Sequence, residues 1–174
     1  MTVSTRSGNS RGPAGNAART AAGPAFTVRP VLATDVPHVA AIDERITGIG
    51  KAAYWTEVFE RYTRHRTGER FFFVAAPATN AAEQRVLGFI IGEIRTWEFG
   101  SAPCGWVFAL SVDPAVRLRG VGEALFESLS DAFRTAGVTR MRTMVARDNR
   151  LHLLFFRGEG MMAGPYIQLE KDLG

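Results

Sequence analysis

The segment VDPAVRLRGVGEAL, residues 112–125, joins an apolar run to a helical pattern and carries residues suited to binding an anion. The first turn of a helix has free N–H groups and the positive end of the helix dipole. Gly120 and Gly122 would let the backbone come close to a ligand, while Arg117 and Arg119 would donate charge-assisted hydrogen bonds to phosphate oxygens. The turn is therefore predicted to hold phosphate, and the alternative is a tight turn with solvated arginines.

Two common phosphate-binding motifs do not match this segment. A Walker A loop requires Gly-Lys-Ser or Gly-Lys-Thr, which follows neither glycine. A dinucleotide-binding fingerprint requires a third glycine where Leu125 stands, and it follows the first strand of a domain, whereas this segment lies late in the chain. Neither a nucleoside triphosphate nor a dinucleotide is favoured as the ligand.

Hydrophobic periodicity predicts strands and helices in mixed order on both sides of the turn. Strands are expected at 26–30, 71–76, 86–97, 106–112, 139–146 and 165–169, and helices at 34–47, 55–62, 121–136 and 151–157. This order predicts an α/β or α+β layered domain.

The first 25 residues differ in composition from the rest of the chain. They are rich in Gly, Ala, Ser and Asn, contain three arginines and have no acidic residue. Such a segment has little to bury, so residues 1–25 are predicted to form a disordered tail and residues 26–174 the domain. An organelle transit peptide is the alternative for the tail, although no amphipathic pattern is visible in it.

Composition limits the class of protein. A chain of 174 residues with 46% hydrophobic residues can bury the core of one soluble domain, and no apolar run approaches membrane-spanning length. The net charge of +4 suits an anionic ligand without requiring nucleic acid, although the many arginines leave a nucleic-acid-binding protein as a rival interpretation. Cys104 has no second cysteine to pair with, which favours a reducing compartment. The protein is expected to be cytoplasmic, with neither nucleic acid nor membrane as a partner.

The stretch LSVDPAVRLRGVGEALFESL, residues 110–129, resembles motif A of the GNAT acetyltransferase superfamily. That motif is an apolar strand, Val-x-Pro, and then Arg/Gln-x-x-Gly-x-Gly/Ala opening a helix. A second family pattern follows at the matching spacing, with Asn149, Phe155-Phe156 and Gly160-Met161, and the closing IQLEKDL resembles the family's last strand. The resemblance covers the chain from Phe26 to its end.

The resemblance implies a GNAT-type central mixed, mostly antiparallel sheet flanked by helices, with a cofactor cleft between the motif A strand and the following strand. It implies acetyl-CoA as co-substrate, with pyrophosphate on the turn and pantetheine paired with the motif A strand. No metal is expected, since the three histidines show no ligand spacing. The expected cofactor-binding residues are Leu110, Ser111, Val112, Arg117, Leu118, Arg119, Gly120, Val121, Gly122, Glu123, Ala124, Asn149, Phe155 and Phe156.

Direct acetyl transfer requires a neutral amine, and an amine of the lysine type has a reference pKa near ~10.4, so a carboxylate commonly removes its proton. Family members often carry a strand glutamate as base and a helix tyrosine as acid, but Trp106 and Phe156 stand at those positions here. Glu93 and Glu98 are the expected replacement bases, and Tyr166 is the expected acid. For Glu93 a salt bridge with an arginine is the alternative.

These observations predict an N-acetyltransferase that moves an acetyl group from acetyl-CoA to a primary amine by direct transfer. The acceptor is expected to be a small-molecule or peptide amine, and a homodimer is left open. Because the usual glutamate and tyrosine are missing, the alternative is a catalytically weak acyl-CoA-binding regulatory module.

Overall fold

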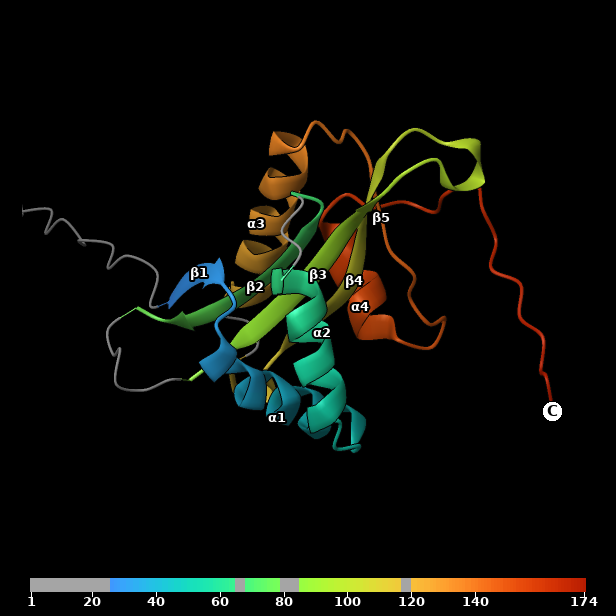
Figure 1. Cartoon of the computed structure of the whole chain (residues 1–174). Coiled ribbons are helices and arrows are strands. Elements are labelled where there is room, and N and C mark those ends of the chain that lie inside the picture. The colour runs from blue at the N-terminus through green and yellow to red at the C-terminus, as the bar shows by residue number, and fades with distance from the viewer. Residues whose placement is uncertain (1–25, 65–67, 79–84, 117–119) are drawn as a thin grey trace, which may run out of the picture.

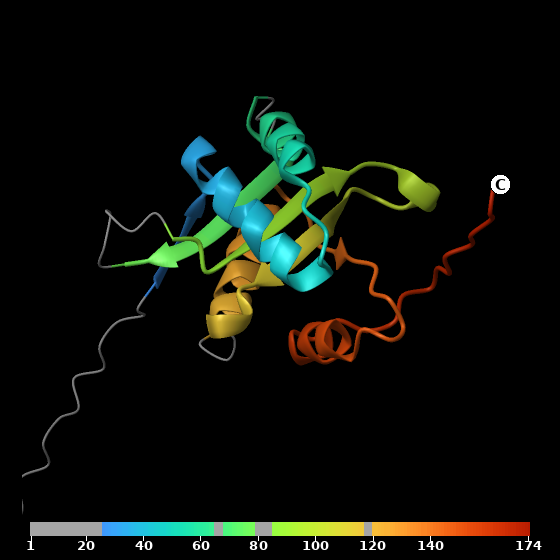
Figure 2. The same cartoon turned by 90° about the horizontal axis from the view of Figure 1, so that it is seen from below.

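A five-stranded sheet carries helices on both faces in the part of the chain that the structure describes, residues 26–64, 68–78, 85–116 and 120–174 (Figures 1 and 2). In this computed structural model the strand order is β1-β2-β3-β4-β5, with β1 to β4 antiparallel and β5 parallel to β4. The strands are β1 (Phe26–Pro30), β2 (Arg70–Pro77), β3 (Gly88–Arg95), β4 (Cys104–Val112) and β5 (Met141–Arg142). The helices are α1 (Val36–Thr47), α2 (Ala52–Arg64), α3 (Val121–Thr135) and α4 (Arg150–Gly158). The predicted layered α/β class is confirmed, whereas the predicted tail at 1–25 lies outside the described residues.

Two predicted strands differ from the structure at the carboxyl end of the chain. The strand expected at 139–146 is reduced to the two residues of β5, and the prediction of a strand at 165–169 is wrong. Ile167 and Leu169 alternate with polar residues as a strand would, but their side chains are 83% and 85% exposed. The segment runs away from the body of the molecule (Figure 1), so no neighbouring strand completes its hydrogen bonds.

The core consists of two hydrophobic clusters, one on each face of the sheet. Figure 2 shows α1 and α2 on one face and α3 and α4 on the other. Phe89 and Ile91 of β3 belong to the cluster under α1 and α2, while Ile90 between them belongs to the cluster under α3. All three side chains are fully buried, which explains why the sequence of β3 is continuously apolar here and does not alternate between apolar and polar residues.

A buried carboxylate joins α1 to α2. Asp43 of α1 is 7% exposed, and its Oδ2 accepts a hydrogen bond from Trp55 Nε1 at 3.0 Å and lies 2.9 Å from Lys51 Nζ. Trp55 also packs edge-on against Phe89 of β3. This junction fixes where α2 lies over the sheet.

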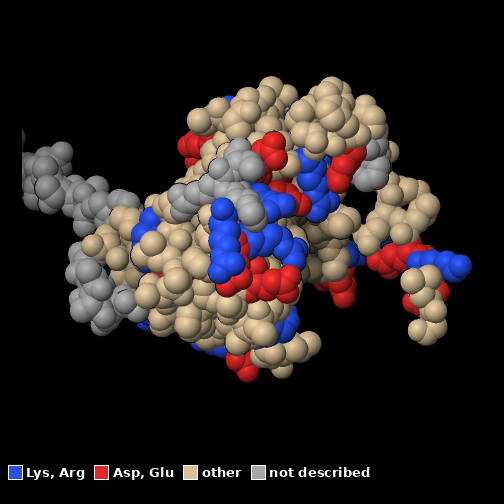
Figure 3. Space-filling model, viewed as in Figure 1, with Lys and Arg blue, Asp and Glu red and all other residues tan. Residues whose placement is uncertain are grey.

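The exposed side of α2 mixes positive and negative charge. Arg61 pairs with Glu57 and Arg64 with Glu60, each one helical turn apart. Figure 3 shows basic and acidic side chains side by side on this face. The arginines of α2 therefore do not form a continuous basic surface of the kind that binds nucleic acid.

Two glycines let α3 lie close against the sheet. A Cβ at Gly105 of β4 would lie 2.5 Å from Phe133 Cδ2, and one at Gly92 of β3 would lie 2.8 Å from Leu129 Cδ2. Both contacts are shorter than carbon atoms tolerate. The absence of side chains at these positions therefore sets the distance between α3 and the two central strands.

Gly105→Ala is expected to lower the free energy of unfolding by roughly 1–3 kcal/mol, because the added methyl group overpacks the Phe133 ring. Gly158→Ala near the end of α4 is the matched control, since a Cβ there has no neighbour within 4 Å. Chemical denaturation of both variants measures the difference. Equal stability of Gly105→Ala and the unmodified protein would show that α3 does not pack this closely.

Candidate functional site

Strands β4 and β5 separate after two paired positions. Gly105 pairs with Met141 and Trp106 with Arg142, and Thr143 Oγ1 then donates a 3.1 Å hydrogen bond to the carbonyl oxygen of Val107. Beyond this point the edge of β4 at 108–112 pairs with no other strand among the described residues, although its opposite edge is bonded to β3. Unpaired N–H and C=O groups on a strand edge can bind an extended ligand by main-chain hydrogen bonds.

The predicted cofactor-binding residues of β4 lie on this edge. Leu110 points into the core cluster under α3 and is 8% exposed, whereas Ser111 and Val112 are half-buried. The backbone groups of all three are within the separated part of β4. Their contact with a cofactor stays a prediction.

A β-bulge lies at the point of separation. Ile91 pairs with Ala109 and Gly92 with Val107, so Phe108 is an extra residue in β4 with no partner in β3. Its side chain is 47% exposed and stacks on Tyr62 of α2, with ring centroids 6.4 Å apart. The sequence contains no signal for this bulge, because the apolar run continues through it.

Helix α3 begins directly after the predicted phosphate-binding turn. Gly120 is its N-cap residue with φ of +74°, a left-handed conformation that favours glycine. Val121 is buried, Ala124 is half-buried and Glu123 is exposed. Arg117, Leu118 and Arg119 lie outside the described residues, so their predicted role stays a prediction.

Gly122 has a packing role that the sequence did not predict. A Cβ at this position would lie 3.1 Å from Phe155 Cε2 of α4. The missing side chain therefore lets Phe155 of α4 approach α3, and the predicted contact of Gly122 with a cofactor stays a prediction.

A buried carboxylate holds the end of β4 and the start of the turn. Asp113 Oδ1 accepts a 3.0 Å hydrogen bond from the N–H of Ala115, in the short helix η3 (Pro114–Val116). Its Oδ2 lies 3.2 Å from Arg45 Nη2 of α1 and 3.6 Å from Arg85 Nη2. No role for Asp113 was predicted from the sequence, although a polar residue directly after the expected strand at 106–112 was an available signal.

The second-motif residues lie in and before α4. Asn149 caps the helix, with Oδ1 accepting a 3.1 Å hydrogen bond from the N–H of His152. Phe156 is 7% exposed and packs on Phe126 of α3, and Phe155 is half-buried against the same ring. Core packing accounts for both phenylalanines in this structure, and their predicted proximity to the cofactor arm stays a prediction.

Glu93, the first predicted base, is engaged by two neighbours. Its Oε1 accepts a 2.8 Å hydrogen bond from Arg95 Nε, and its Oε2 accepts one of 3.2 Å from the hydroxyl of Tyr62. Burial, together with the charge of Glu93, raises the pKa of Tyr62, so this phenol stays protonated. The salt bridge with an arginine, expected as the alternative for Glu93, is present.

Glu98, the second predicted base, has an unused oxygen. It lies in the short helix η2 (Glu98–Gly100), with Oε1 at 3.8 Å from Arg95 Nη1. Its Oε2 is buried and has no hydrogen-bond partner among the described residues, and the same holds for Nε1 of Trp106 in β4. The Arg95 guanidinium lies over the Trp106 ring, 4.9 Å from its centroid. Two buried polar atoms without hydrogen-bond partners, Glu98 Oε2 and Trp106 Nε1, therefore belong to residues that contact Arg95.

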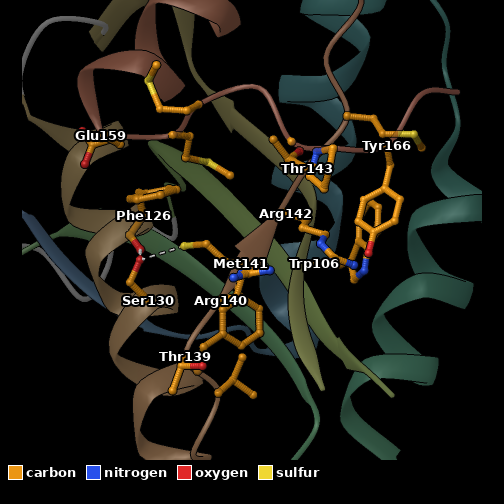
Figure 4. A pocket seen from close by; sticks show the side chains of 18 of the residues that line it. Trp106, Phe126, Ser130, Thr139, Arg140, Met141, Arg142, Thr143, Glu159 and Tyr166 are labelled. Atoms are coloured by element: carbon orange, nitrogen blue, oxygen red, sulfur yellow. Dashed lines mark hydrogen bonds between the residues drawn. The ribbon is translucent and has the colours of Figure 1, made fainter. Parts of the chain in front are cut away.

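Tyr166, the predicted acid, packs against β5. The Arg142 guanidinium lies 4.8 Å from its ring centroid, and Arg142 Nη1 donates a 3.2 Å hydrogen bond to Ser101 Oγ. Both residues line a cavity of about 1070 Å³ bounded by α3, β5 and the C-terminal segment. Figure 4 shows Trp106, Arg142 and Tyr166 together on one side of this cavity.

Neither a metal site nor a membrane span is present in the described part of the chain. No three His, Cys, Asp or Glu side chains there form a group that could hold a metal ion. None of the described helices combines the length and the apolar character that crossing a membrane would need.

The sequence matches the model of the acetyltransferase (GNAT) family over residues 37–160. This match confirms the resemblance inferred from the two motifs. It covers every described element from α1 to α4, including the separated strands and the helix after the turn.

A curated relative and several solved structures are also similar. An L-2,4-diaminobutyric acid acetyltransferase from Nocardia farcinica is 35% identical over 88 residues, which are 51% of this chain and 43% of the relative. The match thus spans less than half of that relative's length. An aminoglycoside N-acetyltransferase AAC(6′)-Iy in complex with CoA has a TM-score of 0.72 at 16% identity, over 86% of this chain and 95% of its own. Glucosamine-6-phosphate N-acetyltransferase from Arabidopsis thaliana has a TM-score of 0.66 at 18% identity, over 86% and 99%. At these identities the solved structures confirm the predicted fold.

Proposed function

Because the chain belongs to the acetyltransferase (GNAT) family, we propose that it transfers an acetyl group from acetyl-CoA to a primary amine of a small molecule. The observation that carries this proposal is the separation of β4 from β5 next to the start of α3. A strand edge and a helix amino terminus side by side offer main-chain donors and acceptors for an extended arm and a positive dipole for phosphate. The relative named as a diaminobutyric acid acetyltransferase supports a small amine as acceptor.

The described residues fit acetyl-CoA at these two places. The unpaired edge of β4, residues 108–112, would pair with the amide groups of pantetheine, and the start of α3 at Gly120 would hold the pyrophosphate. Arg117 and Arg119 would add charge-assisted hydrogen bonds to the phosphates. The thioester would then lie near the bulge at Phe108, where the strands meet.

The reaction needs a base for the amine and a leaving group that accepts charge. The neutral amine nitrogen attacks the thioester carbonyl carbon, a C–N bond forms and the C–S bond breaks, and CoA leaves as thiolate or thiol. One ammonium proton must be removed before the attack and a second after it. We assign proton removal to Glu98, directly or through water, because its Oε2 is unpaired while both oxygens of Glu93 are engaged. Tyr166 or water would return a proton to the CoA sulfur.

An acyl-CoA-binding module without turnover is the competing function. The assay that separates the two measures CoA release with a panel of amines, beginning with L-2,4-diaminobutyrate. Release that depends on the amine supports the transferase, whereas tight acetyl-CoA binding without release would support the module. A cytoplasmic location and a homodimer stay predictions.

Acetyl-CoA at about 100 times its Kd should raise the melting temperature by roughly 5–10 °C, as mass action requires for a domain of this size. Gly120→Asn should keep this shift and Gly120→Asp should at least halve it. Both side chains tolerate the left-handed conformation and are good N-cap residues, but only Asp places a negative charge where phosphate would bind. Equal shifts of the melting temperature in the two variants would show that the pyrophosphate does not bind at this turn.

Glu98→Gln should lower kcat by about 10²–10⁴-fold while the melting temperature stays unchanged, because a general base is lost and no strong contact is broken. Glu93→Gln should have the opposite pattern. It should lower the free energy of unfolding by roughly 1 kcal/mol, because Glu93 bonds to Arg95 and Tyr62, and it should lower kcat by less than about tenfold. Steady-state kinetics and thermal unfolding of the two variants decide between the glutamates. A larger loss of kcat in Glu93→Gln would assign the base to Glu93.

A further inference from the structure

We propose that two copies of this chain associate by exchanging the segment 165–173, which each copy adds as a strand to the outer edge of β5 in the other. The proposal does not depend on the transferase function. It follows from two features of the chain, a sheet edge and an apolar segment, that have no strand partner among the described residues. The two features match each other in hydrogen bonding, in apolar pattern and in charge.

The outer edge of β5 is open. β5 is the last strand of the sheet, and within the described ranges it pairs only with β4. The N–H and C=O groups on its other edge therefore have no strand beside them in this part of the chain. Such an edge is a template for a strand from another chain, which adds main-chain hydrogen bonds along it.

The segment 165–173 exposes apolar side chains that a strand would place on one side. Ile167, Leu169 and Leu173 are almost fully exposed, and in an extended chain they would share one side with Lys171. The opposite side would carry residues with polar groups, namely Tyr166, Gln168, Glu170 and Asp172. A cluster of exposed apolar residues in one short segment is typical of an interaction site.

The α3 face of β5 matches the apolar side of the segment. Met141 and Val145 are half-buried and pack against the core cluster under α3. Figure 4 shows Met141 directed toward Phe126 and Ser130 of α3. A strand added to the edge of β5 would place Ile167 and Leu169 on this same face, where they would extend the core instead of facing water.

The opposite face of β5 matches the other side of the segment in charge. Arg142 stacks on Tyr166 there, and Arg140 lies on the same face by alternation and is exposed. Residues 139–150 contain four arginines and one aspartate. With its apolar side toward α3, the segment would bring Glu170 and Asp172 to the arginine face, where opposite charges attract.

The cavity beside β5 has room for one more strand. Both β5 and residues 164–169 line this cavity of about 1070 Å³, and no strand pair joins them. A strand of five residues occupies roughly 800 Å³ at the usual spacings of about 4.8 Å between strands and about 10 Å between layers. The segment of the same copy contacts the Arg142 side chain through Tyr166, and beyond it the chain runs away from the body (Figure 1).

A second copy satisfies both features at once. In a two-fold arrangement each copy gives its own segment and receives its partner's, so the same contacts form twice. A strand from an unrelated protein would cover the edge of β5 but leave Ile167, Leu169 and Leu173 exposed. The occupant that fits the edge is therefore the segment of a second copy of this chain.

Sedimentation equilibrium tests the association. The unmodified protein should be a dimer at about 100 μM. The double variant Ile167→Asp/Leu169→Asp should raise the Kd of the dimer by at least about 100-fold, because charges would replace side chains that the dimer buries. Circular dichroism should not change, since both residues are exposed in the single chain. Leu154→Asp is the control, because Leu154 is an exposed residue of α4 outside the cavity lining, and this variant should remain a dimer.

Cross-linking tests which copy receives the segment. Gln168→Cys and Met144→Cys are placed in separate chains, which are mixed and treated with a short bis-maleimide. Both positions are exposed and lie on the arginine face of the proposed strand pair, whereas Cys104 is 2% exposed and should not react. We expect covalent pairs that contain one chain of each kind. A chain with both substitutions is the control for a link within one copy.

Three results would overturn the proposal. A monomer at about 100 μM would exclude exchange between copies. A dimer that persists in Ile167→Asp/Leu169→Asp would place the interface elsewhere. Links that form only within the doubly substituted chain would show that the segment returns to its own β5. None of these results depends on acetylation, so failure of the proposed transferase function would leave the test intact.

Discussion

The short pairing of β4 with β5 is the constraint on which the rest of the site depends. Two paired positions and the Thr143 side-chain bond hold the strands together, and the remaining edge of β4 is available for another hydrogen-bonding partner. A longer ladder would satisfy that edge within the protein and leave no place for an extended ligand. The bulge at Phe108 occurs at the same point, so the change in β4 geometry coincides with the end of the pairing.

Close packing of α3 on the sheet maintains this arrangement. The missing side chains at Gly92 and Gly105 let Leu129 and Phe133 approach the central strands, and Gly122 lets Phe155 of α4 approach α3. Asp113 fastens the chain between β4 and α3 to Arg45 and Arg85. The helix start at Gly120 and the open edge of β4 are therefore held in a fixed relation by contacts next to both and by the packing of α3 on the sheet.

How much of this could be predicted from the sequence depends on the range of the interactions. Helix α3 after Gly120 and the apolar strand β4 follow from local patterns, and both were predicted. The bond between Tyr62 and Glu93 depends on how α2 packs on the sheet, and the bulge at Phe108 depends on strand register, and local sequence patterns reveal neither. The prediction of a strand at 165–169 is wrong because alternation shows only that a segment is compatible with a strand. Ile167 and Leu169 are exposed and do not pack against the sheet. The packing role of Gly122 was missed because a glycine near a helix start has the same appearance whether a ligand or a side chain approaches it.

Amide hydrogen exchange with and without acetyl-CoA tests whether the open edge of β4 binds the cofactor, because it reports on individual backbone groups. The amides of residues 108–112 that face away from β3 should exchange quickly in the free protein. Acetyl-CoA should slow them by at least about tenfold, together with the first amides of α3. If acetyl-CoA binds but protects only the cavity between β5 and the C-terminal segment, the open edge of β4 is not the cofactor site.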